Sequence, residues 1–223
     1  MGIQFPENFN FPYLATSPRD FWKRWHISLS TWFRDYLYIP LGGSKGTKWL
    51  TVRNIFITFI ASGLWHGANW QFLTWGAAHA LLYTIYFLLK KNLSQPKIII
   101  SKDNLFPTPK EFFQILSTYF SITIVWVFFR GESIMESLVY LYNMFYNFSF
   151  PSTNLGGFLL IFPFVCFEWL FRHDQKLIYF IDGRFKYSKY NLNRICYYLI
   201  LFFLIAKLLS NESETTDFIY FQF

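Results

Sequence analysis

Three of the four histidines in this sequence lie in or beside apolar stretches. They are His26, His66 and His79, whereas His173 lies in the charged run RHDQK and is expected at the solvated surface. An imidazole within apolar sequence is costly unless it is hydrogen-bonded or faces a cavity, so a functional role is the first hypothesis. The alternative, a packed histidine whose hydrogen bonds are satisfied, remains open for each of the three.

His66 has the most informative surroundings. It ends an apolar segment between Gly63 and Gly67, which let the backbone turn or let another group approach closely, and Trp65 and Trp70 bracket it. A histidine at a break between two apolar segments can line a cavity filled by water or substrate. Because an imidazole titrates near neutral pH, His66 is suited to accept a proton from a hydroxyl group as a general base.

The other two histidines differ in context. His26 lies on the apolar face of a helical stretch, four residues after Trp22 and three before Leu29, and is expected to form a wall of the same cavity. His79 lies in the segment GAAHA, residues 76–80, among small residues that allow close helix packing. For His79, a packing or orienting hydrogen bond is favoured over catalysis.

Other chemistries find little support in the residue pattern. The histidines show no His-x₃-His or His–Glu pairing, so no metal site is predicted. The segment GGSKG, residues 42–46, lacks the spacing of a phosphate-binding loop and is expected to turn between helices. No Gly-x-Ser-x-Gly nucleophile elbow is present.

The composition indicates whether these histidines lie in a soluble protein or in a membrane protein. Charged residues make up 15% of the chain, hydrophobic residues 53% and aromatic residues 24%, whereas an average soluble domain has about 25% charged residues. The net charge of +7 arises from basic residues that lie in gaps between apolar segments. This distribution favours loops held at an anionic membrane surface and disfavours a nucleic-acid interface. The fold class predicted is all-α, a multi-pass transmembrane helical bundle.

Five segments are long and apolar enough to be embedded in a membrane as helices. The first two are joined by a very short turn, residues 67–69, and are expected to form a hairpin over residues 50–89 that carries His66. The five segments are Leu50–Trp65, Trp70–Leu89, Phe112–Phe129, Leu155–Phe171 and Ile195–Leu209.

Two further stretches have helical periodicity but too much charge to span, and they are predicted to lie at the interface. The first covers residues 17–39 and contains His26; Ser17 is its expected N-cap, with Pro18 at the first helical position. Its basic residues, Lys23, Arg24 and Arg34, lie opposite the apolar face. The second stretch is Glu132–Phe145.

Basic and non-basic loops alternate in step with the five crossings. Residues 45–53, 90–110 and 172–194 are rich in Lys and Arg, whereas residues 131–154 carry none. The basic loops are therefore predicted to be cytoplasmic and the acidic C-terminal tail to lie outside.

Two long motifs resemble the membrane-bound O-acyltransferase family. The first is SPRDFWKRWHISLSTWFRDYLYIPLGG, residues 17–43, and the second is GLWHGANW, residues 63–70. The ending FIYFQF, residues 218–223, is also similar to the branch of the family that acts in bacterial alginate O-acetylation. The resemblance runs from about Phe11 to the end of the chain.

The resemblance implies transfer of an acyl group to a hydroxyl, usually on a cell-envelope or secreted polysaccharide. It implies that His66 corresponds to the family's essential histidine and His26 to its second motif histidine, and that both are catalytic. Trp65 and Asn69 are expected to shape the pocket or to bind the developing oxyanion. Three more expected pocket residues belong to the first motif: Trp25, Arg24 and Asp35.

The resemblance also implies an acyl donor and a location. The donor would be acetyl-CoA or a carrier-protein thioester from the cytoplasmic side, with no bound cofactor and no metal. The chain would lie in the bacterial inner membrane. Its partners would be the lipid bilayer, a polysaccharide acceptor and a periplasmic or extracellular acyltransferase, and nucleic acid is not expected.

Several alternatives remain open. They are transfer of D-alanine to a teichoic acid-type polymer, a non-catalytic membrane subunit that docks a partner acyltransferase, and a transporter. The last is disfavoured because the sequence lacks paired intramembrane acids and an inverted repeat. Family members are about twice this length, so residues 1–223 are expected to be the C-terminal portion of a larger membrane domain, with a partial fold.

Overall fold

The computed structural model describes residues 6–89, 107–147, 161, 164–166 and 168–169. The chain divides into two compact units, Met1–Gly157 and Phe158–Phe223. In the second unit the described residues are helical, in agreement with part of the predicted segment Leu155–Phe171. The predicted segment Ile195–Leu209 lies outside the described residues. The labelled helices all belong to the first unit.

Helices α3 and α4 form the hairpin predicted for residues 50–89. Helix α3 spans Lys48–His66 and begins at Thr47, whose side chain accepts a hydrogen bond from the Leu50 N–H. Helix α4 spans Trp70–Leu89, with the predicted bounds. The chain turns between them at Gly67, whose φ of 155° and ψ of 150° are readily adopted only by glycine.

Two glycines bring the backbones of α3 and α4 into direct contact. A Cβ atom at Gly63 would collide with the carbonyl oxygen of Phe72, and a Cβ atom at Gly76 would collide with the carbonyl oxygen of Phe59. Each glycine therefore packs its bare Cα against the backbone of the opposite helix, as small residues do where membrane helices cross closely. This contact fixes α3 relative to α4 only a few residues from His66.

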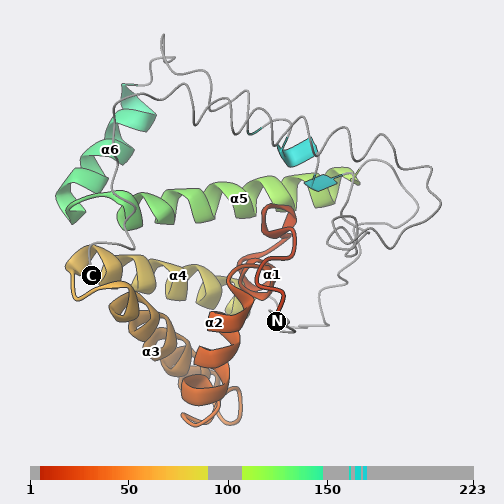
Figure 1. The fold of residues 1–223 in the computed structure, drawn as a ribbon, viewed down its shortest axis with the longest axis vertical. Coiled ribbons are helices and arrows are strands. Elements are labelled where there is room, and N and C mark those ends of the chain that lie inside the picture. The colour runs from red at the N-terminus through yellow and green to blue at the C-terminus, as the bar shows by residue number, and fades with distance from the viewer. Residues whose placement is uncertain (1–5, 90–106, 148–160, 162–163, 167, 170–223) are drawn as a thin grey trace, which may run out of the picture. The chain divides into compact units, whose positions relative to one another are not determined.

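Helices α5 and α6 follow the loop after α4. Helix α5, Pro109–Arg130, starts in a capping box formed by Thr108 and Glu111 and lies along α4 (Figure 1). Helix α6, Ile134–Tyr146, is capped by Ser133 and contacts α5. These helices confirm the helical predictions for Phe112–Phe129 and Glu132–Phe145.

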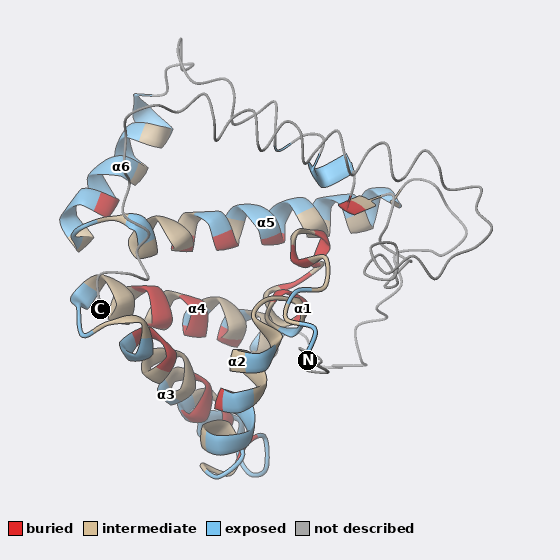
Figure 2. Cartoon of the chain, in the orientation of Figure 1, coloured by how far each residue is buried: buried red, intermediate tan, exposed pale blue. Residues whose placement is uncertain are grey.

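Among the described residues, α4 and α5 are the two helices long and apolar enough to cross a membrane. Helix α3 does not meet the same criterion, so the predicted segment Leu50–Trp65 is confirmed as a helix but not as a span. The reason lies in its first half, where Arg53 and Asn54 interrupt the apolar sequence. All described helices fit the predicted all-α class. Many large apolar residues of α5 and α6 are exposed, and Figure 2 shows exposed positions along both helices.

The predicted single helix over residues 17–39 is broken. It consists of α1, Pro18–Arg24, α2, Ile27–Phe33, and a π-helical segment η2, Arg34–Tyr38. The predicted cap is confirmed, because Ser17 Oγ accepts a hydrogen bond of 3.2 Å from the Asp20 N–H. The break lies at Trp25 and His26.

The cause of the break is the preceding segment, which supplies hydrogen bonds that a continuous helix would not need. The carbonyl oxygen of Asn8 accepts from the Ile27 N–H at 2.9 Å, and Asn8 Oδ1 accepts from the Ser28 N–H at 3.1 Å. Asn8 thereby caps α2, while the Asn10 N–H donates to the last carbonyl of α1, that of Arg24. A 3₁₀-helical turn, η1, Pro12–Leu14, then leads into Ser17.

Asn54 anchors the turn that precedes α3. Its side chain is buried, and its Nδ2 donates to the carbonyl oxygens of Leu41 at 3.1 Å and Gly43 at 3.0 Å. We predict that Asn54→Ala lowers the free energy of unfolding by about 1–3 kcal/mol, because the Gly43 carbonyl loses its buried partner and the Leu41 carbonyl keeps only the longer bond from Arg53 Nη2, at 3.4 Å. Thermal unfolding in detergent measures this. Asn147→Ala, at an exposed position, is the matched control, and equal melting temperatures for the two variants would contradict the assignment.

Candidate active site

Helices α3, α4 and α5 converge on His66. It is the last residue of α3, and its ring lies 4.8 Å from Trp65, 5.3 Å from Trp75 and 5.0 Å from Phe129, measured between ring centroids. All three contacts are edge-to-face. Because the helix must end at Gly67, the imidazole is held at the break between two apolar helices, where the sequence placed it.

The ring of Trp65 contacts both motif histidines, His26 and His66. Its ring lies 4.8 Å from His66 and 6.4 Å from His26, again between centroids. The structure therefore brings His26, Trp65 and His66 together, although 40 positions separate the histidines in the sequence.

His26 adopts an unusual backbone conformation. Its φ of 45° and ψ of 54° lie in the left-handed region, which non-glycine residues adopt at a cost and which is common at functional sites. Its Nδ1 is buried and has no hydrogen-bond partner among the described residues. Burial lowers the pKa of His26 below its ordinary value, which favours the neutral imidazole.

Two of the other predicted pocket residues, Arg24 and Trp25, make contacts within the surrounding fold. Arg24 Nε pairs with Asp20 Oδ1 at 2.9 Å, and its Nη1 donates to the carbonyl oxygen of Asn10. Trp25 packs in an aromatic cluster with Phe21, at 5.7 Å, and Trp126, at 4.8 Å. The first contact holds Asn10 against the end of α1, and the second holds the end of α1 against α5.

The remaining two predicted residues are exposed. Asp35 pairs with its neighbour Arg34 at 2.7 Å, and the guanidinium group lowers the pKa of that carboxyl. Asn69 contributes its backbone carbonyl to the first turn of α4. Neither lines the cavity described next.

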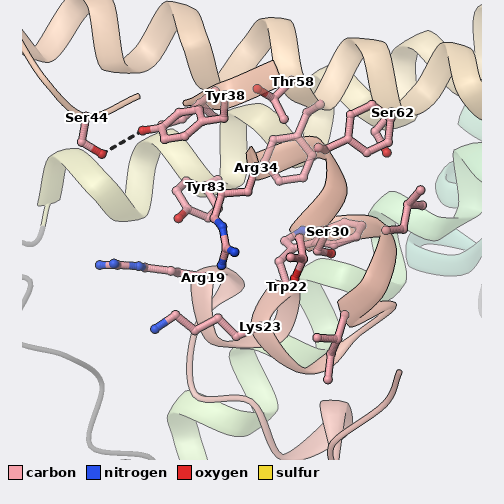
Figure 3. A pocket seen from close by; sticks show the side chains of 16 residues that line it. Arg19, Trp22, Lys23, Ser30, Arg34, Tyr38, Ser44, Thr58, Ser62 and Tyr83 are labelled. Carbon is pink, nitrogen blue, oxygen red and sulfur yellow. Dashed lines mark hydrogen bonds between the residues drawn. The ribbon is translucent and has the colours of Figure 1, made fainter. Parts of the chain in front are cut away.

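A cavity of about 460 Å³ opens between the first motif and the α3–α4 hairpin (Figure 3), a volume suited to a small ligand. Its lining combines three basic side chains with several hydroxyl groups and includes no carboxylate among the described residues. The basic side chains are Arg19, Lys23 and Arg34, and the hydroxyl groups belong to Ser30, Thr31, Tyr38, Ser44, Thr58, Ser62 and Tyr83. Such a lining suits an anionic ligand.

The cavity approaches His66 along α3. Ser62, which lines it, precedes His66 by one helical turn on the same helix face. In Figure 3 the cationic ends of Arg19 and Lys23 lie on one side of the cavity and Ser62 on the other. A ligand whose anionic group met the cations would therefore extend toward the end of α3 that carries His66.

Sequence reasoning identified the polar face of residues 17–39 but not its role as a cavity wall. The sequence feature that could have indicated this role is the spacing of Arg19 and Lys23, which are four residues apart and therefore lie on one face of α1. The opposite wall comes from α3 and α4, and nothing in the local pattern shows which helix faces these cations. The described residues contain no group of three His, Cys, Asp or Glu side chains arranged to hold a metal ion.

Comparison with known proteins shows which family the first part of the chain is similar to. Residues 1–100 match the membrane-bound O-acyltransferase family. Over 134 residues the chain is 44% identical to a probable alginate O-acetylase of Pseudomonas aeruginosa, a match that covers 60% of this chain and 24% of the relative. It is 36% identical over 148 residues to a peptidoglycan O-acetyltransferase of Helicobacter pylori, covering 64% and 25%.

A third relative has a different named activity. The chain is 43% identical over 98 residues to a teichoic acid D-alanyltransferase of Bacillus subtilis, covering 41% of this chain and 25% of the relative. The matched part of the chain thus spans about a quarter of the length of each of these relatives.

Proposed function

Because residues 1–100 are membrane-bound O-acyltransferase sequence, we propose that the protein transfers an acetyl group to hydroxyls of a cell-envelope or secreted polysaccharide. The observation that carries this proposal is the position of His66, at a glycine break between two apolar helices and one turn beyond a cation-lined cavity. The alginate and peptidoglycan O-acetylating relatives support acetyl as the group and a glycan as the acceptor. The apolar helices α4 and α5 support a position in a membrane, and the bacterial relatives support a multi-pass protein of the bacterial inner membrane.

In the proposed reaction His66 is the general base. A glycan hydroxyl oxygen attacks the carbonyl carbon of the acetyl thioester, and His66 accepts the hydroxyl proton. The tetrahedral intermediate then collapses, the carbon–sulfur bond breaks, and the proton passes from His66 to the departing thiolate. The products are the O-acetyl ester and the free thiol. His26 lies across Trp65 from His66, and we assign it the second role, that of positioning the acceptor.

The cavity suggests how the donor is held. Acetyl-CoA and a carrier-protein thioester both carry phosphate groups on a pantetheine arm, and phosphate pairs well with Arg and Lys. Arg19 and Lys23 provide two cations with no carboxylate among the described lining residues, whereas the third cation, Arg34, is paired with Asp35. Hydroxyl groups also line the cavity and would provide further polar contacts for the arm.

We predict that Arg19→Ala raises the KM for acetyl-CoA by about 5–30-fold, because one charge-assisted hydrogen bond is worth about 1–2 kcal/mol here. Because Arg19 binds the ground state and the transition state equally, kcat should change less than twofold. The measurement is transfer of radiolabelled acetyl from acetyl-CoA to the polysaccharide fraction in membranes that contain the protein. Lys110→Ala, an exposed cation on α5, is the control, and an unchanged KM in Arg19→Ala would refute the donor site.

The same membranes test the function itself. Labelled acetate should be released from the polysaccharide by mild alkali, as expected of an O-acetyl ester, and membranes without the protein should show none. The similarity to a teichoic acid D-alanyltransferase favours one second candidate, D-alanyl transfer from a carrier protein. Label from D-alanyl carrier protein in the polymer, with none from acetyl-CoA, would favour that second function.

A further inference from the structure

His79 is buried in a way that packing alone does not account for. It lies in α4 with 1% of its surface exposed, and neither Nδ1 nor Nε2 has a hydrogen-bond partner among the described residues. A neutral imidazole carries one donor and one acceptor, and each buried polar group left unpaired costs about 1–3 kcal/mol. An apolar ring of similar shape would fill this position without that cost.

Two neighbouring tryptophans share this property. The indole Nε1 atoms of Trp22 and Trp75 are buried and have no hydrogen-bond partner among the described residues. The three rings are in mutual contact: His79 lies 4.9 Å from Trp22 and 4.7 Å from Trp75, and the two indoles are 5.9 Å apart, between centroids. We call Trp22, Trp75 and His79 the Trp–His cluster. It concentrates three N–H groups that no described part of the protein satisfies.

The cluster lies between the cavity and His66. On one side, Trp22 lines the cavity, and Phe59, which also lines it, stacks on His79 at 6.1 Å. On the other side, Trp75 lies 5.3 Å from His66. A donor that entered the cavity with its phosphates at the cations would direct its far end, the thioester, toward Trp22, the residue of the cluster that lines the cavity. Trp75 and His79 lie in contact with Trp22.

The surroundings of the cluster suit a group that develops negative charge. The other rings in contact with it are those of Phe21, Phe59, Phe129 and His66. No carboxylate among the described residues pairs with its N–H groups. N–H donors held in an apolar setting stabilise an oxyanion strongly, because they need no reorganisation as charge develops.

We propose that the Trp–His cluster binds the carbonyl oxygen of the donor thioester and stabilises the oxyanion formed when the acceptor hydroxyl attacks. The proposal rests on the acyltransferase function proposed above and adds the residues that bind the acyl group. His66 takes the hydroxyl proton, as before. The cluster donates hydrogen bonds to the oxygen that gains charge and is unchanged when the carbon–sulfur bond breaks and the thiol leaves.

His79→Phe tests the proposal, because it keeps a ring and removes both nitrogens. Acetyl transfer is measured in membranes with acetyl-CoA as the varied substrate, and thermal unfolding is measured on the protein in detergent. We expect kcat to fall about 30–300-fold, KM to stay within threefold and the melting temperature not to fall. Loss of two unpaired buried groups leaves stability unchanged or raises it, whereas a merely structural histidine would show the opposite.

Trp75→Phe provides a second variant that keeps the ring and removes one N–H. Trp126→Phe is its matched control, because Trp126 packs against Phe21 and Trp25 outside the cluster. We expect kcat to fall about tenfold in Trp75→Phe and less than twofold in the control. If His79→Phe also unfolds more easily, the result for Trp75→Phe decides the question.

The outcomes separate this proposal from the function on which it rests. An active wild type with equal kcat values for wild type, His79→Phe and Trp75→Phe would overturn the cluster's role and leave the acyltransferase function standing. A rise in KM without a fall in kcat would also overturn it, since the cluster would then contact another part of the donor. A wild-type protein that transfers no acyl group would overturn both.

Discussion

His66→Ala is expected to reduce acetyl transfer to the polysaccharide by about 10²–10⁴-fold, the range typical of a lost general base. The imidazole is the group that would take the acceptor proton, and its neighbours Trp65, Trp75 and Phe129 offer no replacement base. The loss should appear in kcat, with the KM for acetyl-CoA little changed, because the proposed donor site lies one turn away along α3. Radiolabel transfer at saturating acetyl-CoA measures it.

Two further variants make this result specific. His66→Gln keeps a polar side chain of similar reach but cannot act as a base near neutral pH, so it should be as inactive as His66→Ala. His173→Ala, in the charged run RHDQK, controls for histidine loss as such and should retain full activity. Acylation that survives His66→Ala, in protein that is present in the membrane at normal levels, would remove the proposed mechanism and favour a non-catalytic docking subunit.

The second large effect is expected at the α3–α4 crossing. Gly63→Ala and Gly76→Ala should each lower the free energy of unfolding by about 1–3 kcal/mol, because a methyl group would be forced against a backbone carbonyl that cannot rotate away. The rate of acetyl transfer should fall more than the loss of folded protein alone would cause. Gly63 is three residues from His66 and Gly76 follows Trp75 directly, and a displacement of about 1 Å at a reacting group can cost about 10²-fold in rate.

Leu81→Ala is the matched control for the crossing, since Leu81 lies on α4 with an exposed side chain. It should change neither the melting temperature nor the acetylation rate appreciably. If either glycine variant matched Leu81→Ala in both measurements, the two helices would not be in the contact described. Thermal unfolding in detergent and label transfer in membranes, made on the same preparations, give the comparison directly.

The sequence predicted the long helices well because their signals are local. Apolar runs of nearly 20 residues and a glycine turn are sufficient to define α4 and α5, and the Ser17 cap was readable from three neighbouring residues. The break at His26 was not readable in this way. It depends on Asn8, which bonds to Ser28 across 20 positions, and a periodic pattern contains no information about such a partner.

The distinction between local signals and distant partners also applies to the site. His66 could be predicted from its own flanking residues, because the glycines and tryptophans beside it create the break. The grouping of His26 with Trp65 is a tertiary contact, so it followed only from the resemblance. The cation-lined cavity and the Trp–His cluster are assembled from side chains on different helices, and His79 was expected to make a hydrogen bond that the described residues do not provide.

The hydrogen bonds that Asn8 accepts from α2 limit how much of the N-terminal segment can be removed. A polypeptide that began at Ser17 would contain both sequence motifs in full, yet the first N–H groups of α2 would lose their acceptors and His26 would lose the support for its left-handed backbone. The folding unit therefore extends at least about ten residues upstream of the recognisable motif. Deletion mapping from the N-terminus should locate the functional edge before Asn8, upstream of where a motif alignment would draw it.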